Sequence, residues 1–534
     1  MSVSENKNFI CNIKNPIFPL IIIGGIGLVL RLYYFPFEIP VLADGVDYFS
    51  YAVVTSQQGR IPIDWGLTNN GWPVFLSIIF SLFNSDNFLL LTQIQRFTSI
   101  VISILTVIPV YLLCKKFVDN KFAIVGSSLF ILDPRIVLNS NLGITEPLYI
   151  LLGVTTVVLF LSKRYSLIIL SFVVLGICSI IRYEGFLFFF PLLMIFFMRF
   201  RKNENIIQKT LVIIVMFSLT IFPMTYVMND AIGNDGIIYP IFEGGIKWVT
   251  EIIINGQSDY DDPIYGEAIE GNRISSFLGL GVTNTVKFLG WITIPTFVLF
   301  IPTGIILFLK NRDYKTYTLI LFSLPVLMIT LYAYGRGIEE TRYLYIMLPI
   351  LCVVSSLTIK KFSEKIQKEN IILFVIIIGV LIASVVFLDN KKINQEQEME
   401  LYNIAKDITN IANGINHYGP ESKYIHIAEI SNKWPVIPLP PREENYNQSF
   451  DIKKISPTGY FSLNEYIENA KDKGLTHIVI KKDNNIEIFN DIFNNEEKYP
   501  FLVKKYDSLE KGFNVQIIMY EINYEKFEEI YKKD

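Results

Sequence analysis

A long apolar run, NPIFPLIIIGGIGLVLRLYYF, extends from Asn15 to Phe35 near the N-terminus. A helix rises about 1.5 Å per residue, so roughly 20 apolar residues cross the ~30 Å hydrocarbon core of a bilayer. This run is long enough to cross and has no small-residue cleavage site, so it predicts a retained transmembrane helix rather than a signal peptide. Arg31 near its end is expected to extend toward the interface, beside the aromatic belt formed by Tyr33, Tyr34 and Phe35.

The composition of the whole chain is that of a membrane protein. Its 534 residues are 51% hydrophobic and 18% charged, and the mean hydropathy is +0.40, which is more apolar than an ordinary soluble protein. The net charge of -3 comes with no basic stripe or zinc-finger spacing, so we do not expect a nucleic acid partner. The four cysteines form no Cys-x-x-Cys pair, and the three histidines all lie in the C-terminal part. Neither a disulfide framework nor an imidazole metal site in the membrane portion is therefore expected.

Further apolar runs follow the first along the chain. Together they predict about eleven transmembrane helices, centred on residues 15–35, 94–114, 122–138, 146–162, 166–182, 185–199, 208–228, 286–309, 316–334, 343–359 and 371–388. The shorter stretch GWPVFLSIIFSLF, Gly71 to Phe83, predicts an amphipathic helix at the membrane surface.

Basic residues in alternate loops predict the orientation of these helices. They are Lys115, Lys116 and Lys121, then Lys163 and Arg164, then Arg199, Arg201, Lys202 and Lys209, then Lys310, Arg312 and Lys315, then Lys360, Lys361, Lys365 and Lys368. Because lysine and arginine collect on the cytoplasmic side, the N-terminus is expected inside the cell and the chain after Leu388 outside it.

The change in composition near residue 390 predicts two domains. Residues 1–389 would form the membrane domain, with a first external loop at 36–93 and a second at 229–283, and residues 390–534 an external soluble α/β domain. In the latter, KYIHIAEI (423–430), THIVIKK (476–482) and NVQIIMYEI (514–522) predict strands by their alternation. SLNEYIENAKDKG (462–474) predicts a helix, because it has a Ser-x-x-Glu capping box and a terminal glycine.

Charged residues that could take part in catalysis or binding gather on the predicted outer face. VLADGVDYFSYA, Val41 to Ala52, places Asp44 and Asp47 just beyond the first helix. A carboxylate beside an apolar surface loses hydration, so its pKa rises and it becomes a better proton acceptor. Nearby arginines favour group transfer from a lipid carrier whose leaving group is a phosphate, because a phosphate needs cationic stabilisation.

Five motifs resemble the membrane glycosyltransferases of the GT-C superfamily. They are Asp44-x-x-x-Tyr48-x-x-x-Ala52, GWPVFLSII, TEPLY at Thr145–Tyr149, RYEG at Arg182–Gly185, and ETRYLYIMLPIL at Glu340–Leu351. The similarity extends through Pro349 and is to the family 39-like enzymes, which include protein mannosyltransferases and the aminoarabinose transferases of lipid A. It implies a polytopic helical bundle, a polyprenyl-phosphate-linked sugar donor, an external glycan, protein or lipid acceptor, inversion, and an aspartate base.

The resemblance also implies roles for individual residues. Asp44 would be the general base, with Arg182 and Arg342 on the donor phosphate. The remaining substrate-binding candidates are Asp47, Tyr48, Glu146, Glu184 and Arg336. The family often has Asp-Glu where this chain has Asp44-Gly45, so Asp47 remains an alternative base. No cofactor is required, although a divalent metal is not excluded, and the absent WWDYG signature disfavours en bloc transfer of an oligosaccharide to asparagine.

Purely structural roles compete with each assignment. The two aspartates could cap a helix at a membrane exit, and Glu146 could serve the dipole of the helix that it opens. The arginines could be neutralised by neighbouring glutamates, and the SDYDDP cluster around Asp259–Asp262 is expected to be a solvated loop rather than a cation site. A transporter or flippase for lipid-linked glycans is the alternative function. It would favour charges near the bilayer midplane, whereas here they sit at helix ends.

Overall fold

The computed structural model describes residues 16–83, 85–202, 204–250, 273–364, 369–411, 417–418, 423–436, 453–455, 457, 460–482 and 487–531. The acidic cluster at Asp259–Asp262 lies outside these ranges. The chain divides into two compact units. The first contains Met1–Phe35, Ile61–Leu76 and Gln95–Lys392, and the second contains Pro36–Arg60, Ser77–Ile94 and Ile393–Asp534.

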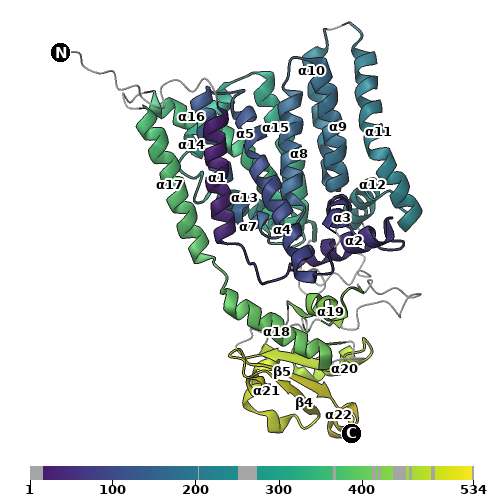
Figure 1. Cartoon of the computed structure of the whole chain (residues 1–534). Helices are drawn as coiled ribbons and strands as arrows, with labels where there is room; N and C mark the ends of the chain where they lie inside the picture. Colours follow the sequence, from purple (N-terminus) through teal and green to yellow (C-terminus); the bar gives the residue numbers. More distant parts are fainter. Residues whose placement is uncertain are drawn as a thin grey trace, which may run out of the picture. The chain divides into compact units, whose positions relative to one another are not determined.

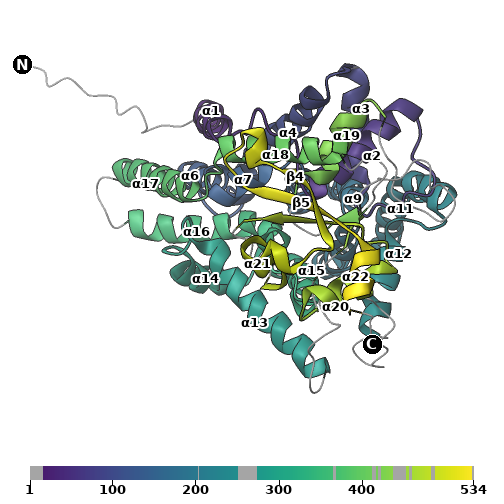
Figure 2. The same ribbon diagram turned by 90° about the horizontal axis from the view of Figure 1, so that it is seen from below.

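The first unit is a bundle of helices. Its elements are α1 (Ile17–Tyr33), α5 (Val107–Cys114), α6 (Asn120–Ile131), α7 (Pro134–Ser140), α8 (Glu146–Phe160), α9 (Tyr165–Ile181), η1 (Tyr183–Phe188), α10 (Phe189–Phe200), α11 (Ile206–Ile232), α12 (Ile238–Ile241), η2 (Phe242–Lys247), α13 (Arg273–Thr293), α14 (Ile301–Lys310), α15 (Tyr314–Gly335), η4 (Thr341–Met347), α16 (Leu348–Ser363) and α17 (Glu369–Asn390). Helices α3 (Gly71–Phe83) and α4 (Phe88–Leu105) contribute residues to both units. Helix α9 packs between α8 and α11 (Figure 1), and α16 lies between α14 and α17 (Figure 2).

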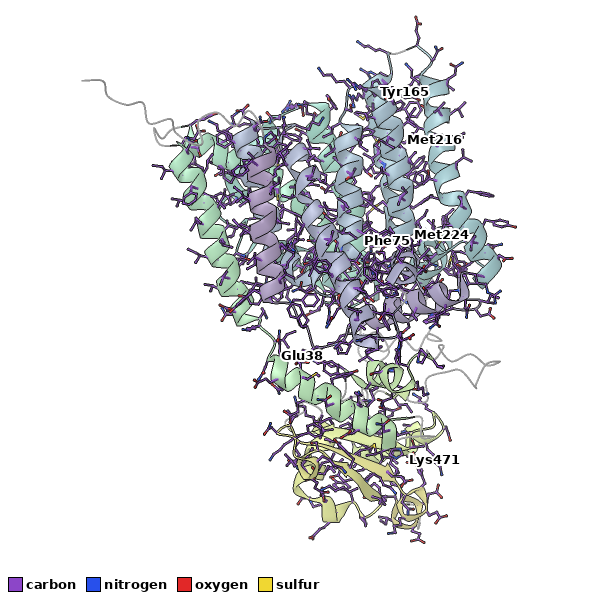
Figure 3. The ribbon with its side chains drawn as sticks, viewed as in Figure 1. Glu38, Phe75, Tyr165, Met216, Met224 and Lys471 are labelled. Atoms are coloured by element: carbon purple, nitrogen blue, oxygen red, sulfur yellow. The ribbon has the colours of Figure 1, made fainter. Side chains whose placement is uncertain are left out.

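The lengths and exposed faces of these helices suit a bilayer. Within the described ranges, six helices are long and apolar enough to cross a membrane, or seven when the bent pair α6 and α7 counts as one span. Helix α11 shows how such a helix faces lipid, because Leu211, Val215, Leu219 and Phe222 are exposed along one side. Figure 3 labels Met216 and Met224 on this helix. The chain is thus a multi-pass membrane protein, and the number of eleven spans stays a prediction.

Two predicted spans are each broken into two helices. The segment 122–138 bends by 53° between α6 and α7, where the Asp133 carboxylate accepts hydrogen bonds from the backbone of Arg135 and Ile136. The segment 286–309 is interrupted between α13 and α14, where Pro295 supplies no backbone N–H. Apolar composition predicts depth in the membrane, whereas proline and a capping aspartate decide where a helix stops.

Arg31 does not extend to an interface, so the expectation from its place near the helix end was wrong. Its side chain is fully buried and donates hydrogen bonds to the carbonyl of Ile131 at 3.0 Å, Ser103 Oγ at 3.0 Å and Ser140 Oγ at 3.1 Å. The break after α6 leaves the Ile131 carbonyl without a helical partner, and the guanidinium satisfies it. A charged side chain inside the hydrocarbon depth is stable only with such partners.

The second unit contains α2 (Asp44–Gln58) and the C-terminal part of the chain. Its further elements are α18 (Gln395–Ile411), β1 (His417–Tyr418), α19 (Ile425–Lys433), β2 (Lys453–Lys454), α20 (Leu463–Lys471), β3 (His477–Lys481), α21 (Glu487–Asn494), η6 (Glu496–Lys498), β4 (Leu502–Asp507), η7 (Leu509–Lys511), β5 (Ile517–Ile522) and α22 (Tyr524–Tyr531). Strands β3, β5 and β4 form an antiparallel sheet in that order, with His477 opposite Glu521, and β1 pairs with β2 in parallel.

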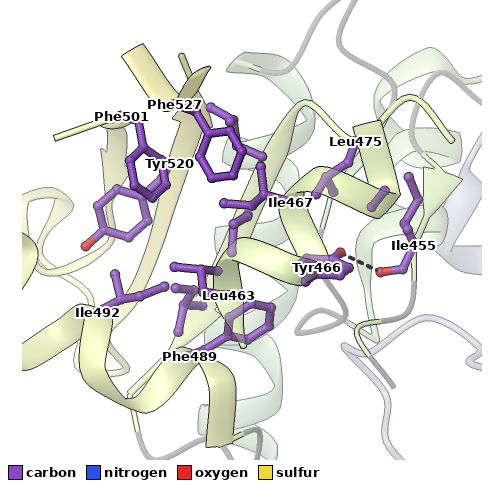
Figure 4. Packing of buried hydrophobic residues seen from close by; sticks show 14 of the residues in the cluster. Ile455, Leu463, Tyr466, Ile467, Leu475, Phe489, Ile492, Phe501, Tyr520 and Phe527 are labelled. Carbon is purple, nitrogen blue, oxygen red and sulfur yellow. Dashed lines mark hydrogen bonds between the residues drawn. The ribbon is translucent and has the colours of Figure 1, made fainter. Parts of the chain in front are cut away.

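A single apolar core holds the helices of this sheet domain against its strands. Buried side chains of β3, β5, α20, α21 and α22 pack into one apolar cluster (Figure 4). Within it the Tyr466 hydroxyl donates a hydrogen bond to the carbonyl of Ile455 at 2.9 Å. Helix α20 begins as predicted, because Ser462 Oγ accepts from the Glu465 backbone at 3.2 Å and the Glu465 carboxylate accepts from the Phe461 backbone at 2.9 Å.

Two of the three predicted strands are confirmed and one is wrong. THIVIKK and NVQIIMYEI form β3 and β5. KYIHIAEI is the helix α19 instead, and it packs against α18 with the rings of Tyr402 and Tyr424 5.9 Å apart. A short apolar run fits either period, and here the packing surface offered by α18 selects the helix.

Candidate functional site

A sharp turn at the end of α9 positions the first charged residues of the site. Arg182 ends α9 in an extended conformation, and the chain turns at once into η1. At Gly185 a Cβ atom would lie 2.9 Å from backbone atoms of Cys178 and Ser179, closer than side chains tolerate. Glycine therefore allows η1 to fold back onto α9. This close approach places Glu184 beside Arg182 and explains the glycine of the RYEG motif.

Arg182 holds two carboxylates at once. Its Nη1 lies 2.7 Å from Glu146 Oε1, and its Nη2 lies 2.9 Å from Glu184 Oε1. Glu146 and Glu184 are only 3% and 6% exposed, so all three charges depend on one another for compensation. Glu146 is also the first residue of α8, where the helix dipole favours a negative charge.

Aromatic rings and a hydroxyl enclose the guanidinium of Arg182. Its Cζ lies 5.5 Å from the ring centre of Tyr149 and 5.9 Å from that of Tyr343, within range of cation–π attraction. Its Nη1 also donates to Thr145 Oγ1 at 3.3 Å. Thr145, Tyr149 and Tyr343 were not predicted as site residues, although they stand inside the TEPLY and ETRYLYIMLPIL motifs. The motifs could have identified them had every member been considered.

Arg342 joins the cluster from η4. Its Nη1 lies 3.9 Å from Glu146 Oε1, and its Nε forms an ion pair with Glu340. The structure thus brings together four of the predicted residues, Glu146, Arg182, Glu184 and Arg342. Together with Tyr149 and Tyr343 they line a small hollow of about 10 Å³, which is about the space that one water molecule occupies.

A larger apolar groove of about 760 Å³ lies next to this hollow, and Glu184 and Ile329 line both. Its walls come from residues 66–68, η1, the end of α11, the α12–η2 region and α15. Arg336 is its one basic lining residue among those that the structure describes. The Arg336 guanidinium stacks 4.7 Å from the ring centre of Trp248 and donates to the Tyr332 hydroxyl at 3.1 Å. An apolar groove with a held cation is suited to a long apolar ligand that carries an anionic group.

The other three predicted residues belong to the second unit, at the start of α2. Asp44 and Asp47 occupy the first turn of that helix, and Ala43 before them has a φ of 48°, a region that residues with a Cβ rarely adopt. Asp47 is exposed, Asp44 is half-buried and the Tyr48 side chain is buried. Although the Asp47 side chain reaches solvent, the protein atoms around its carboxyl group still reduce its hydration. This loss, followed by the charge of Asp44, raises the pKa of Asp47 to about 6.

This raised pKa predicts a pH-dependent stability effect. Between the ordinary carboxyl pKa of about 3.9 and about 6, folded Asp47 holds a proton that the unfolded chain has lost, so stability falls as the pH rises. Asp47→Asn removes this loss of stability, because asparagine does not titrate. We expect its Tm to exceed that of the wild type by more at about pH 7 than at about pH 4. Glu38→Gln, at an exposed carboxylate of the same loop (Figure 3), is the control, and an equal Tm difference at both pH values would contradict the prediction.

Within the described ranges, no group of three His, Cys, Asp or Glu side chains is placed to hold a metal ion.

Comparison with known proteins identifies the fold. No protein-family model and no curated protein matches the sequence. The oligosaccharyltransferase of Archaeoglobus fulgidus, in complex with Zn and sulfate, matches with a TM-score of 0.56 at 13% identity, over 86% of this chain and 67% of that one. Archaeal AglB from the same organism, in complex with an inhibitory peptide and a dolichol-phosphate, matches at 0.53 and 13%, over 87% and 69%.

A third solved structure matches almost end to end. ArnT from Cupriavidus metallidurans, bound to undecaprenyl phosphate, gives a TM-score of 0.55 at 8% identity, over 94% of this chain and 97% of that one. The resemblance predicted from short motifs is thereby confirmed at the level of the fold. The chain shares the fold of the archaeal oligosaccharyltransferase and of ArnT.

Proposed function

We propose that this protein is an integral membrane glycosyltransferase that moves a sugar from a polyprenyl phosphate to an acceptor on the extracytoplasmic face. The observation that carries the proposal is the apolar groove, which contains Arg336 and adjoins the cluster of Arg182 and Arg342. The matched structures were solved with dolichol-phosphate in one and undecaprenyl phosphate in another. A groove of about 760 Å³ has room for part of such a prenyl chain.

The charged residues divide into two groups on this proposal. Arg182 is bound to a carboxylate through each Nη, so it chiefly orients Glu146 and Glu184, which accept hydrogen bonds from sugar hydroxyls. Arg336 and Arg342 stabilise the phosphate that leaves. As the phosphate departs it gains negative charge rather than a proton, so cations suit it better than an acid.

Asp44 remains the proposed general base, on the strength of its motif in the first loop. The acceptor hydroxyl oxygen forms a bond to the anomeric carbon, the bond from that carbon to the phosphate oxygen breaks, and the hydroxyl proton passes to the carboxylate. Attack from the face opposite the leaving group inverts the anomeric centre. Asp47 and Tyr48 are proposed neighbours of that step, and the N-terminus is proposed to be cytoplasmic with residues 390–534 outside.

A transfer assay tests the proposal. Purified protein in detergent is offered a panel of polyprenyl-phosphate sugars with glycan, peptide and lipid acceptors, and released polyprenyl phosphate and glycosylated product are measured. We expect turnover with at least one donor. Arg336→Met should raise the donor KM about tenfold or more with a smaller change in kcat, because a charge-assisted hydrogen bond contributes about 1.5–3 kcal/mol.

Lys287→Met is the matched control, because Lys287 pairs at the surface with Glu339 at 3.5 Å and does not line the groove among the described residues. No turnover with any donor, together with translocation of lipid-linked glycan in proteoliposomes, would replace the proposal by a flippase.

A further inference from the structure

An aromatic cluster joins α2 to the segment that follows α19. Trp434 comes directly after α19, and its ring centre lies 5.5 Å from that of Phe88 and 6.0 Å from that of Phe49. Phe49 in turn lies 5.5 Å from Phe88 and 5.8 Å from Phe80. These are the separations of attractive ring pairs. Four rings from chain segments about 350 residues apart thus pack together in the second unit.

Hydrogen bonds fix the register of this contact. The Trp434 indole N–H donates to the carbonyl of Asp86 at 2.7 Å. The Gln57 side-chain amide, near the end of α2, donates to the carbonyl of Pro435 at 3.4 Å. The Phe49 side chain on α2 is fully buried. The indole is therefore held in one orientation, against one face of α2.

The same helix carries the proposed base. Phe49 follows Asp47 by two residues and Asp44 by five, so ring and carboxylates belong to the first two turns of one rigid element. A displacement of Phe49 is transmitted along the helix to both carboxylates. Misplacing a catalytic group by about 1 Å can cost about 10²-fold in rate.

We propose that Trp434 is a positioning residue for catalysis, which holds α2 so that Asp44 and Asp47 keep their reactive position. This inference rests on the proposed function. It gives the C-terminal part of the chain a role in the reaction through α2, without contact between Trp434 and the reacting atoms.

Steady-state kinetics of Trp434→Ala test the proposal. We expect kcat to fall at least tenfold while the donor KM stays within about twofold, because the groove is built from other residues. Trp434→Phe keeps a ring against Phe49 and Phe88 and should retain kcat within about threefold. Phe461→Ala is the control, because Phe461 is an aromatic residue of the same unit that is 93% exposed, and it should leave kcat unchanged.

Two further measurements separate positioning from a loss of folding. Hydrogen exchange of the α2 amides should be faster in Trp434→Ala than in the wild type and unchanged in Phe461→Ala, whatever the enzymatic activity. In a double-mutant cycle, Phe49→Ala and Trp434→Ala together should lower kcat no more than the stronger single variant, because both remove one contact.

The outcomes distinguish the two proposals. A wild type that transfers no sugar from any donor refutes the proposed function and with it the catalytic role of Trp434. An active wild type whose Trp434→Ala variant keeps its kcat, or whose α2 exchange is unchanged, overturns only the positioning role. A fall in kcat that comes with an equally raised donor KM also overturns it, because the groove would then have been disturbed.

Discussion

Asp44→Asn is expected to lower kcat for sugar transfer by about 10²–10⁴-fold and to leave the donor KM within about twofold. General base catalysis contributes an effect of this size, and the asparagine amide cannot take the proton. Asparagine is nearly isosteric with aspartate and suits the start of a helix equally well. A capping role for Asp44 would therefore survive the substitution, and only a chemical role would be lost. Single-turnover kinetics with saturating donor measure the step directly.

Asp47→Asn is the matched control for this experiment, because Asp47 stands in the same helical turn as a second carboxylate. We expect a reduction in kcat of less than about tenfold for this variant. The reverse order, with Asp47→Asn the more damaged, would transfer the role of base to Asp47. Full activity in both variants would refute a base on α2.

Arg182→Met is expected to destabilise the protein by about 3–5 kcal/mol, the cost of breaking a buried ion pair while its partners remain charged. Glu146 and Glu184 would both lose their bonds of 2.7 and 2.9 Å. Methionine keeps most of the side-chain volume, so the loss reports on charge rather than on a cavity. Denaturant unfolding in detergent micelles, followed by tryptophan fluorescence, measures the change in the free energy of unfolding.

A compensating variant makes this second prediction specific. Neutralising the carboxylates as well, in the triple variant Arg182→Met, Glu146→Gln and Glu184→Gln, should recover at least half of the lost stability. Lys247→Met is the control, because Lys247 forms an ion pair with Glu243 at 2.7 Å and its side chain is 53% exposed. It should cost no more than about 1 kcal/mol. A triple variant as unstable as Arg182→Met would show that the buried charges are not what Arg182 compensates.

The sequence predicted well those features that depend on local composition. Apolar runs placed the helices of the bundle, and the capping box at Ser462 and Glu465 placed the start of α20. The local sequence pattern was insufficient where tertiary packing or unpaired backbone groups determine the conformation of a segment or the position of a side chain. The alternation in KYIHIAEI predicted a strand, but the segment packs against α18 as a helix. Arg31 was expected at an interface, but it lies inside the bundle, where it donates a hydrogen bond to the Ile131 carbonyl at the end of α6.

The candidate site was predicted in part for the same reason. The motifs singled out Glu146, Arg182, Glu184 and Arg342, but the spacing of 36 residues between Glu146 and Arg182 does not reveal an ion pair. That pair follows from the packing of α8 against α9. The groove could not be predicted, because its walls come from five segments, several of them far apart in the sequence. The contacts of Trp434 could not be predicted either, since its partners are about 350 residues away.

The buried position of Arg31 has a consequence for the biogenesis of the protein. Ribosomes synthesise α1 first, yet the groups that receive the hydrogen bonds of its guanidinium from elsewhere in the chain are Ser103, Ile131 and Ser140. Until about 110 further residues have been translated, the Arg31 guanidinium in the newly synthesised helix lacks all three of these acceptors together. We expect the insertion machinery or lipid headgroups to solvate that charge in the interval. We therefore expect the N-terminal helices to assemble together rather than to insert independently one after another.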